Sequence, residues 1–180
     1  MMTMHRTLHS HEEGHSMLTR RFFLTNGAIG LAAWFGSSRL FTVLGAEEAL
    51  QVTHTDAEWR KLLTPDQYAV LRQSATERPF TSPLLNEHRP GVFACAGCDN
   101  SVFSSETKFE SGTGWPSFWA PLNEQVIGTT RDTTLDMIRV EVHCSRCGGH
   151  LGHVFNDGPK VTGLRYCMNG VAMTFKPTTA

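Results

Sequence analysis

The sequence lacks an excess of charge of either sign. Its 180 residues include 16 lysines and arginines against 17 aspartates and glutamates, a formal net charge of -1. This balance excludes a nucleic-acid-binding protein that is held by bulk positive charge. With 40% hydrophobic and 18% charged residues, the composition also argues against a long disordered protein.

Helical periodicity is scarce as well. Thr55 with Glu58 and Thr64 with Gln67 form two capping boxes, which predict two short helices before Pro79. After these helices no helical period appears, and short apolar runs lie between glycines and prolines instead. The chain is therefore expected to be one mainly β domain.

The clearest predicted strand covers residues 137–143. In it Ile138, Val140 and Val142 alternate with Arg139 and other polar residues. This period of two places the apolar side chains on one face and the polar side chains on the other.

The sequence also lacks a hydrophobic run long enough to span a membrane comfortably. The uncharged run from Phe22 to Ser38 has 17 residues, whereas a transmembrane helix needs about 20. Two arginines precede it within Thr19–Thr25, TRRFFLT, an order that resembles a twin-arginine export signal. The signal is expected to be removed, or to serve as an anchor, near Gly45 to Ala49.

This signal sets the expected organisation of the chain. Residues 1–46 form an N-terminal extension with the signal segment, residues 47–54 a linker and residues 55–180 the folded domain. Four of the nine histidines fall between His5 and His15, ahead of the signal. On its face this tract resembles a metal-scavenging segment, but Met17 stands where an export signal would begin, so the first sixteen residues are expected to be an artefact of the chosen start codon. Export implies a periplasmic protein that contacts the membrane only transiently.

Four of the five cysteines form two C-x-x-C pairs, Cys95 with Cys98 and Cys144 with Cys147. Two such turns can supply four thiolates to one tetrahedral ion, with zinc as the first choice. Iron in the same four-thiolate site and two disulfides in an oxidising compartment are the alternatives. The long gap between the pairs predicts a sheet inserted between the two knuckles.

The fifth cysteine, Cys167, has no sequence partner. A buried structural thiol is one interpretation. Strand alternation, however, places Arg165, Cys167 and Asn169 on one face, and a cation beside a thiol favours the nucleophilic thiolate. Cys167 is therefore a candidate nucleophile.

Two further clusters are candidates to join Cys167. His150 and His153 follow the second knuckle, where neighbouring glycines predict a loop. Trp115 lies on a segment rich in glycine and proline, where an indole can wall a pocket for an apolar group. Satisfied structural histidines and a tryptophan packed in the core are the alternatives.

These motifs together resemble the methionine-(R)-sulfoxide reductase family, commonly called MsrB. The resemblance runs from about Trp59 to Phe175 and is carried by LTPDQYAVLR, PFTSPLL, GVFACAGC, KFESGTGWPSF, CSRCGGHLGHVFNDGP and RYCMNGVAMTF. It implies a mainly β fold of two antiparallel sheets (Mss4-like, or β-tent) with short N-terminal helices and a four-cysteine zinc knuckle pair. By resemblance, one structural Zn2+ is bound, away from the chemistry, by Cys95, Cys98, Cys144 and Cys147.

The resemblance also assigns roles in the reaction. Cys167 would attack the sulfoxide sulfur, and His150 or His153 would supply a proton to the departing oxygen. Asn169 would orient the oxygen or the thiol, and Arg165 would favour the anion. The implied apolar substrate contacts are Trp115, Phe118 and Phe155.

The sequence departs from one common form of the family. Many members have a resolving cysteine just before the Gly-Trp-Pro-Ser-Phe segment, where this chain has Thr113. With four thiols on zinc, no free second cysteine remains. We expect a one-cysteine cycle in which a thioredoxin-like protein or a small thiol reduces a sulfenic acid on Cys167 directly. The expected substrates are oxidised proteins or peptides that contain methionine sulfoxide. We expect the enzyme to be a monomer and to bind no nucleic acid.

Two other functions fit parts of the same pattern. One is a zinc-knuckle binding module without catalysis, in which Cys167 is merely structural. The other is a Cys-His hydrolase in which Cys167 forms an acyl-enzyme. Formation of a sulfenic acid on Cys167 when the protein meets a sulfoxide, with no acyl adduct, separates the reductase from both.

Overall fold

The computed structural model describes residues 49–178. The predicted signal segment, residues 1–46, lies outside the described residues, as do the first residues of the predicted linker. No helix between residues 49 and 178 combines the length and the hydrophobicity that a membrane crossing requires.

Two short helices open the described chain, α1 (Asp56–Leu62) and α2 (Pro65–Gln73). Both begin with the predicted capping boxes. The Thr55 hydroxyl accepts from the Glu58 backbone N–H while the Glu58 carboxylate accepts from the Thr55 N–H, and the pair at the start of α2 does the same. The caps satisfy N–H groups that have no partner within a helix.

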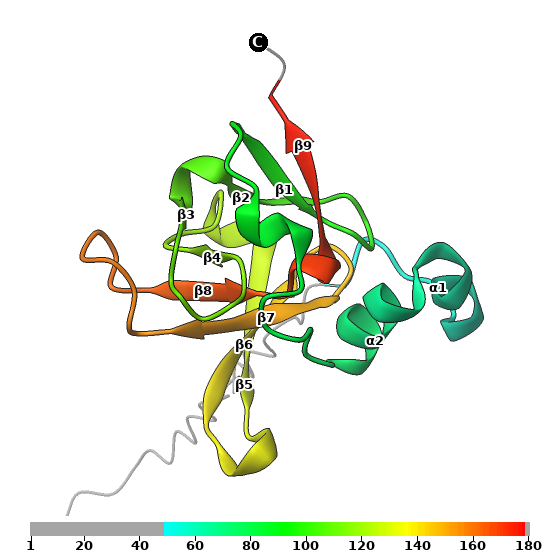
Figure 1. Ribbon diagram of the computed structural model, residues 1–180. Helices are drawn as coiled ribbons and strands as arrows, with labels where there is room; N and C mark the ends of the chain where they lie inside the picture. Colours follow the sequence, from blue (N-terminus) through cyan, green and yellow to red (C-terminus); the bar gives the residue numbers. More distant parts are fainter. Residues whose placement is uncertain (1–48, 179–180) are drawn as a thin grey trace, which may run out of the picture. The chain divides into compact units, whose positions relative to one another are not determined.

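Within residues 49–178, nine strands form two antiparallel sheets (Figure 1). The smaller sheet has the order β2-β1-β9 and contains β1 (Gly91–Cys95), β2 (Ser101–Ser104) and β9 (Met173–Pro177). The larger sheet has the order β3-β4-β8-β7-β6-β5 and contains β3 (Lys108–Phe109), β4 (Ser117–Phe118), β5 (Ile127–Asp132), β6 (Arg139–Cys144), β7 (His150–Phe155) and β8 (Arg165–Met168). The 3-10 helices are η1 (Pro83–Asn86), η2 (Ser105–Thr107), η3 (Glu124–Val126), η4 (Thr134–Asp136) and η5 (Gly170–Ala172). The predicted mainly β class, with two antiparallel sheets and short N-terminal helices, is confirmed.

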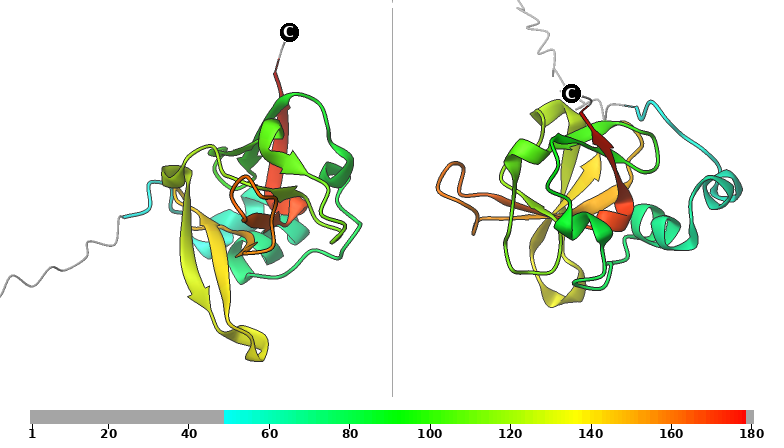
Figure 2. Two further views of the ribbon diagram at one scale, coloured as in Figure 1. Left: turned by 90° about the vertical axis from the view of Figure 1, so that its left-hand side faces the viewer. Right: turned by 45° about the horizontal axis from the view of Figure 1, so that its top comes forward.

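An aromatic cluster joins the two sheets. Phe93 on β1, Phe103 on β2 and Phe118 on β4 are all fully buried. The rings of Phe103 and Phe118 stack with their centroids 4.5 Å apart, and Phe93 meets Phe118 edge-on at 5.0 Å. The helices lie at one side of the sheets (Figure 2), where α2 packs against β7 and η5. The core therefore reaches from the small sheet to the strands that carry the candidate site.

The prediction of a loop around His150 and His153 is wrong, because these residues belong to β7. Gly152 explains the misleading signal. A Cβ atom there would lie 2.2 Å from the carbonyl oxygen of Cys167 on β8. The glycine permits close approach of two strands and does not make a turn.

The apolar face predicted for residues 137–143 is buried only in part. Val142 is fully buried, whereas Val140 is 41% and Ile138 73% exposed. The hairpin formed by β5 and β6 extends beyond the rest of the sheet (Figure 1), so the core covers only the base of the hairpin.

Phe118→Ala tests the aromatic cluster. We expect the free energy of unfolding to fall by about 3 to 5 kcal/mol, because the change removes a buried ring and leaves a cavity between the sheets. Urea denaturation followed by circular dichroism measures the loss. Leu62→Ala is the control, since Leu62 is 60% exposed, and its effect should stay within about 0.5 kcal/mol. Equal losses in the two variants would contradict this view of the core.

Candidate active site and thiol cluster

Cys167 lies on β8, in the interior of the larger sheet. Its antiparallel partners are Ser117 on β4 and His153 on β7, and His153 pairs in turn with Glu141 on β6. Directly opposed residues in a sheet project to the same face. Ser117, Cys167, His153 and Glu141 therefore form one line of side chains across four strands, which we call the Cys167 row.

Each predicted histidine is held by a carboxylate. His150 Nδ1 lies 2.7 Å from Glu141 Oε1, and His153 Nε2 lies 2.8 Å from Asp132 Oδ2. The two imidazole centroids are 5.4 Å apart. The opposite nitrogen of His150, Nε2, is buried and has no hydrogen-bond partner among residues 49–178. Both rings are thus oriented, each through a different nitrogen.

The surroundings of His153 favour its neutral form. Burial lowers the pKa of His153, and the charges of Arg139 and His150 lower it further, whereas the hydrogen bond that its ring donates to Asp132 raises it. Asp132 itself is firmly ionised. Hydrogen bonds from the Thr134 backbone and hydroxyl, and then from His153, hold the pKa of the Asp132 carboxyl well below its usual range.

The predicted placement of Arg165 beside Cys167 is found in the structure. Arg165 is buried, and its guanidinium donates two hydrogen bonds of 2.9 Å to the Asp157 carboxylate. Asp157, followed by Cys167, raises the pKa of Arg165, so the positive charge is permanent. The guanidinium also lies 4.5 Å from the ring centroid of Phe155, which places Phe155 on the same side of the sheet as Cys167.

A chain of hydroxyl groups leads away from the Cys167 sulfur. Thr113 Oγ1 lies 3.8 Å from Cys167 Sγ, and Ser111 Oγ lies 2.8 Å from Thr113 Oγ1 and 2.7 Å from Ser117 Oγ. Ser117 donates onward to the Trp115 carbonyl at 3.2 Å. With a protonated thiol, each group donates to the next toward Trp115. With a thiolate, Thr113 and Ser111 can turn their protons toward the sulfur.

The backbone of Glu77 holds two of the predicted site residues by hydrogen bonds. The Glu77 N–H donates to Asn169 Oδ1 at 2.9 Å, and the Trp115 indole Nε1–H donates to the Glu77 carbonyl at 2.9 Å. The Asn169 amide also donates to the Leu151 carbonyl at 3.1 Å. Asn169 lies just beyond β8, at the start of η5, and its amide is largely occupied by the backbone. Its geometry suits a positioning role.

Phe118 is not brought to the site. Its neighbour Ser117 belongs to the Cys167 row, so the alternation along β4 turns Phe118 to the opposite face, into the core. The fully buried ring offers no surface to a substrate. Its predicted role as a substrate contact is therefore corrected to that of a core residue beneath the site.

Sequence reasoning missed the partners of the predicted residues: Asp132, Glu141 and Asp157 for the charged groups, and Ser111 with Ser117 for the hydroxyl chain. The one available signal was the polar face of residues 137–143, which includes Glu141. The other pairings depend on strand register, which the local sequence does not display.

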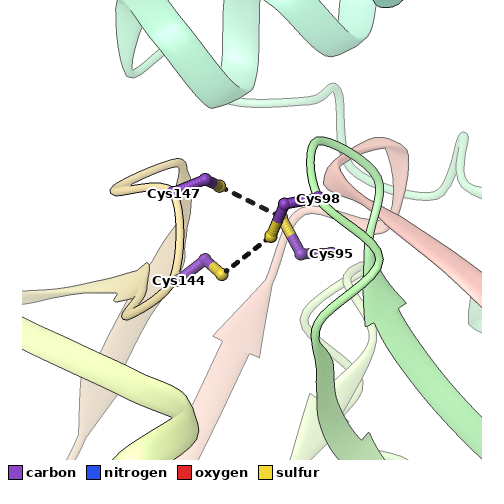
Figure 3. A group of neighbouring side chains, drawn as sticks. All are labelled: Cys95, Cys98, Cys144 and Cys147. Atoms are coloured by element: carbon purple, nitrogen blue, oxygen red, sulfur yellow. Dashed lines mark hydrogen bonds between the residues drawn. The ribbon is translucent and has the colours of Figure 1, made fainter. Parts of the chain in front are cut away.

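The four remaining cysteines gather at one point between the sheets (Figure 3). Cys95 and Cys98 lie at the turn after β1, and Cys144 and Cys147 at the turn between β6 and β7. Their sulfur atoms all lie within 4.8 Å of one another. The contacts of 3.7 Å and 3.5 Å across the cluster are far longer than a disulfide bond, and all four thiols are free.

The spacing of these sulfur atoms fits a tetrahedral metal ion. Bonds of about 2.3 Å to a central zinc would place neighbouring sulfur atoms about 3.8 Å apart, close to the two contacts of 3.7 Å and 3.5 Å. Four thiolates gathered this tightly repel one another unless a cation balances them. The cluster also anchors β7, since the Cys144 N–H donates to the Gly149 carbonyl at 2.9 Å and His150 follows directly.

Comparison with known proteins places this arrangement in a family. The SelR domain matches residues 63–177. The peptide methionine sulfoxide reductase MsrB of Agrobacterium fabrum is 52% identical over 127 residues, which cover 71% of this chain and 94% of that protein. Proteins of the same name from Methanosarcina barkeri (54% over 125 residues, 69% and 88% covered) and Leptospira interrogans (50% over 126 residues, 70% and 96% covered) are also similar.

Among solved structures, the Mis18 'Yippee-like' domain is 20% identical with a TM-score of 0.42, covering 51% of this chain and 100% of that one. This weak likeness carries no functional information. The SelR match is decisive, because it spans residues 63–177, the part of the chain that contains the Cys167 row and both cysteine pairs. The chain belongs to the SelR domain family, the family of the MsrB peptide methionine sulfoxide reductases.

Proposed function

We propose that this chain reduces methionine-(R)-sulfoxide in oxidised proteins or peptides, with Cys167 as the nucleophile. The observation that carries the proposal is the position of Cys167, which lies opposite His153 and beside the Arg165 charge. The family relationship supports the same reaction, since the relatives are peptide methionine sulfoxide reductases by name. The preference for the R epimer is carried over from the family.

The reaction transfers one oxygen atom and two electrons. The Cys167 thiolate attacks the sulfoxide sulfur, the sulfur–oxygen bond breaks, and the oxygen ends on Cys167 as a sulfenic acid. One proton is consumed and methionine leaves. The departing oxygen is a poor leaving group unless it is protonated, so an acid must stand close to Cys167.

We assign the acid to His153, with His150 as its neighbour. His153 is the direct cross-strand partner of Cys167, and Asp132 holds its ring through Nε2. The acid is the protonated ring, which donates its Nε2–H to Asp132 and carries a second proton on Nδ1 for the departing oxygen. Because burial lowers the pKa of His153, this proton is readily given up. His150 is 3% exposed, and its buried Nε2 has no hydrogen-bond partner in the described part of the chain, which suits a second hydrogen bond to the sulfoxide oxygen. Trp115 and Phe155 would supply apolar walls for the substrate methyl group.

The reductive half of the cycle uses an external thiol. Thr113 presents a hydroxyl 3.8 Å from the Cys167 sulfur, in the place where a resolving cysteine would act. A thioredoxin-like protein or a small thiol would attack the sulfenic acid, release water and form a mixed disulfide. A second thiol would then restore Cys167. The hydroxyl chain through Ser111 would stabilise the anionic sulfur without offering it a disulfide partner.

We further propose that the four clustered cysteines hold one structural Zn2+. Their thiolate donors and their spacing suit zinc, which would tie the turn after β1 to the turn before β7. The ion would supply folding energy and would take no part in the redox step.

The N-terminal sequence adds a proposed location. Its paired arginines, Arg20 and Arg21, support export by the twin-arginine route to the periplasm. A protein that folds and binds zinc before export would protect its four ligand thiols from oxidation in that compartment.

Cys144→Ser tests the metal site. Purified wild-type protein should contain about one zinc per chain, whereas the variant should contain almost none and should unfold at a lower temperature, because three thiolates hold the ion less well. Elemental analysis and thermal denaturation measure both effects. Cys167→Ser is the matched control and should keep its zinc. Iron in the wild-type protein, or two disulfides, would contradict the assignment.

Cys167→Ser tests the nucleophile. We expect reduction of a peptide that contains methionine-(R)-sulfoxide to fall by at least about a thousandfold, with dithiothreitol as reductant, because serine lacks the nucleophilic thiolate. In the wild-type protein, one turnover without reductant should leave a sulfenic acid on Cys167, detected by mass spectrometry after dimedone trapping. An intramolecular disulfide would refute the one-cysteine cycle, and an acyl adduct would favour a hydrolase. Bound zinc without any turnover would favour a binding module.

Asp132→Asn tests the acid. The Asp132 carboxylate raises the pKa of His153 against the effect of burial, so the neutral amide should make His153 lose its proton at a lower pH. The alkaline limb of the kcat/KM profile, measured from about pH 5 to about pH 9, should therefore move to lower pH. Asp136→Asn on the same hairpin should leave the profile unchanged. A uniform loss of activity with an unmoved limb would show that His153 is not the acid.

A further inference from the structure

Phe80 adopts a backbone conformation that its side chain disfavours. Its φ of 64° lies in the left-handed region, where the Cβ atom of an L-residue crowds the following carbonyl. Within residues 49–178 the other residues with positive φ, glycines apart, are Ser74, Asp99 and Asp136. These three have short polar side chains, and Asp is among the types that tolerate this region. Phe80 is the one large apolar side chain among them.

Burial does not compensate for this conformation. The Phe80 side chain is 69% exposed, so most of the ring remains in water. A residue that is strained and also exposes its aromatic ring contributes little to the free energy of folding. The reason for a phenylalanine at this position must therefore lie outside the stability of the free chain.

The ring is nevertheless held in place. The Phe80 N–H donates to the Gly114 carbonyl at 2.8 Å. A Cβ atom on Gly114 would lie 2.9 Å from two carbons of the Phe80 ring and 2.9 Å from the Cβ of Pro79, so Phe80 and Pro79 both rest on the bare backbone of Gly114. Three residues earlier, the Glu77 carbonyl accepts from the Trp115 indole. Two hydrogen bonds thus fix segment 77–80 against residues 114–115.

This attachment places Phe80 at the rim of the candidate active site. Gly114 follows Thr113, whose hydroxyl lies 3.8 Å from the Cys167 sulfur, and precedes Trp115, the proposed wall for the methionine methyl group. Pro79 and Phe80 therefore contact the residue that lies between Thr113 and Trp115 in the chain.

We propose that Phe80 is a binding contact for apolar residues that flank the oxidised methionine in a polypeptide substrate. The inference rests on the proposed function. A peptide whose sulfoxide reaches Cys167 past Trp115 must lay its neighbouring residues on the adjoining rim. Methionine usually lies among apolar residues in protein cores, and a rigid, exposed ring is a surface that such neighbours can cover on binding.

Phe80→Gly separates this role from a structural one. Glycine relieves the left-handed conformation, so the temperature of unfolding should stay the same or rise. Two substrates are compared with dithiothreitol as the reductant: N-acetyl-methionine-(R)-sulfoxide methylamide, and a peptide with leucines on both sides of the sulfoxide. We expect KM for the leucine-flanked peptide to rise about five- to tenfold. The kcat/KM for N-acetyl-methionine-(R)-sulfoxide methylamide should stay within about twofold of the wild-type value.

Two further variants sharpen the test. Asparagine tolerates positive φ but is polar, so Phe80→Asn should lose affinity for the peptide as Phe80→Gly does. Leu62→Ala removes a similarly exposed apolar side chain, 60% exposed, from α1. It should leave the kinetic constants for both substrates unchanged.

Three outcomes would overturn the proposal. Equal losses on both substrates together with a lower unfolding temperature would make Phe80 a structural contact. Unchanged peptide kinetics, with a raised KM only for a thioredoxin used in place of dithiothreitol, would make it a docking residue for the reductant. If the wild-type protein reduced neither substrate, the proposed function itself would fail, and this inference with it.

Discussion

The candidate site depends on the close antiparallel pairing of β7 with β8. At Gly152 the two backbones approach so closely that a Cβ atom would lie 2.2 Å from the Cys167 carbonyl oxygen. That approach sets the register in which His153 faces Cys167 and Phe155 faces Arg165. A shift of one residue would turn each of these side chains to the opposite face, so the register carries the proposed chemistry.

The thiol cluster and the site are coupled through this pairing. The second knuckle ends at Cys147, and β7 begins at His150, so whatever fixes the knuckle fixes the start of the strand that carries both histidines. The far end of the sheet supplies the carboxylates, with Asp132 on β5 and Glu141 on β6. The thiol cluster and the hairpin of β5 and β6 thus position the two imidazoles from different ends of the sheet.

Local features of the fold were predictable from the sequence, and features that depend on register were not. The capping boxes involve residues three apart, and the two C-x-x-C pairs gather their ligands in short turns, so both are visible locally. The carboxylate partners of the histidines are not visible in the local sequence, because Asp132 and His153 are 21 positions apart. The resemblance implied that Phe118 contacts the substrate, whereas Phe118 lies in the core. Its neighbour Ser117 lies opposite Cys167, and only the register shows which of the two faces the site.

The division of the five thiols is consistent with the proposed cycle, in which Cys167 acts without a second cysteine. Four of them lie within 4.8 Å of one another, and a cation would hold them as ligands. Cys167 faces one guanidinium and a hydroxyl chain, and it keeps part of its surface exposed. A hydroxyl at Thr113 can donate to an anionic sulfur but cannot form a disulfide with it. In the proposed cycle the oxidised sulfur is reduced by a thiol from solution, and the partly exposed position of Cys167 is compatible with that step.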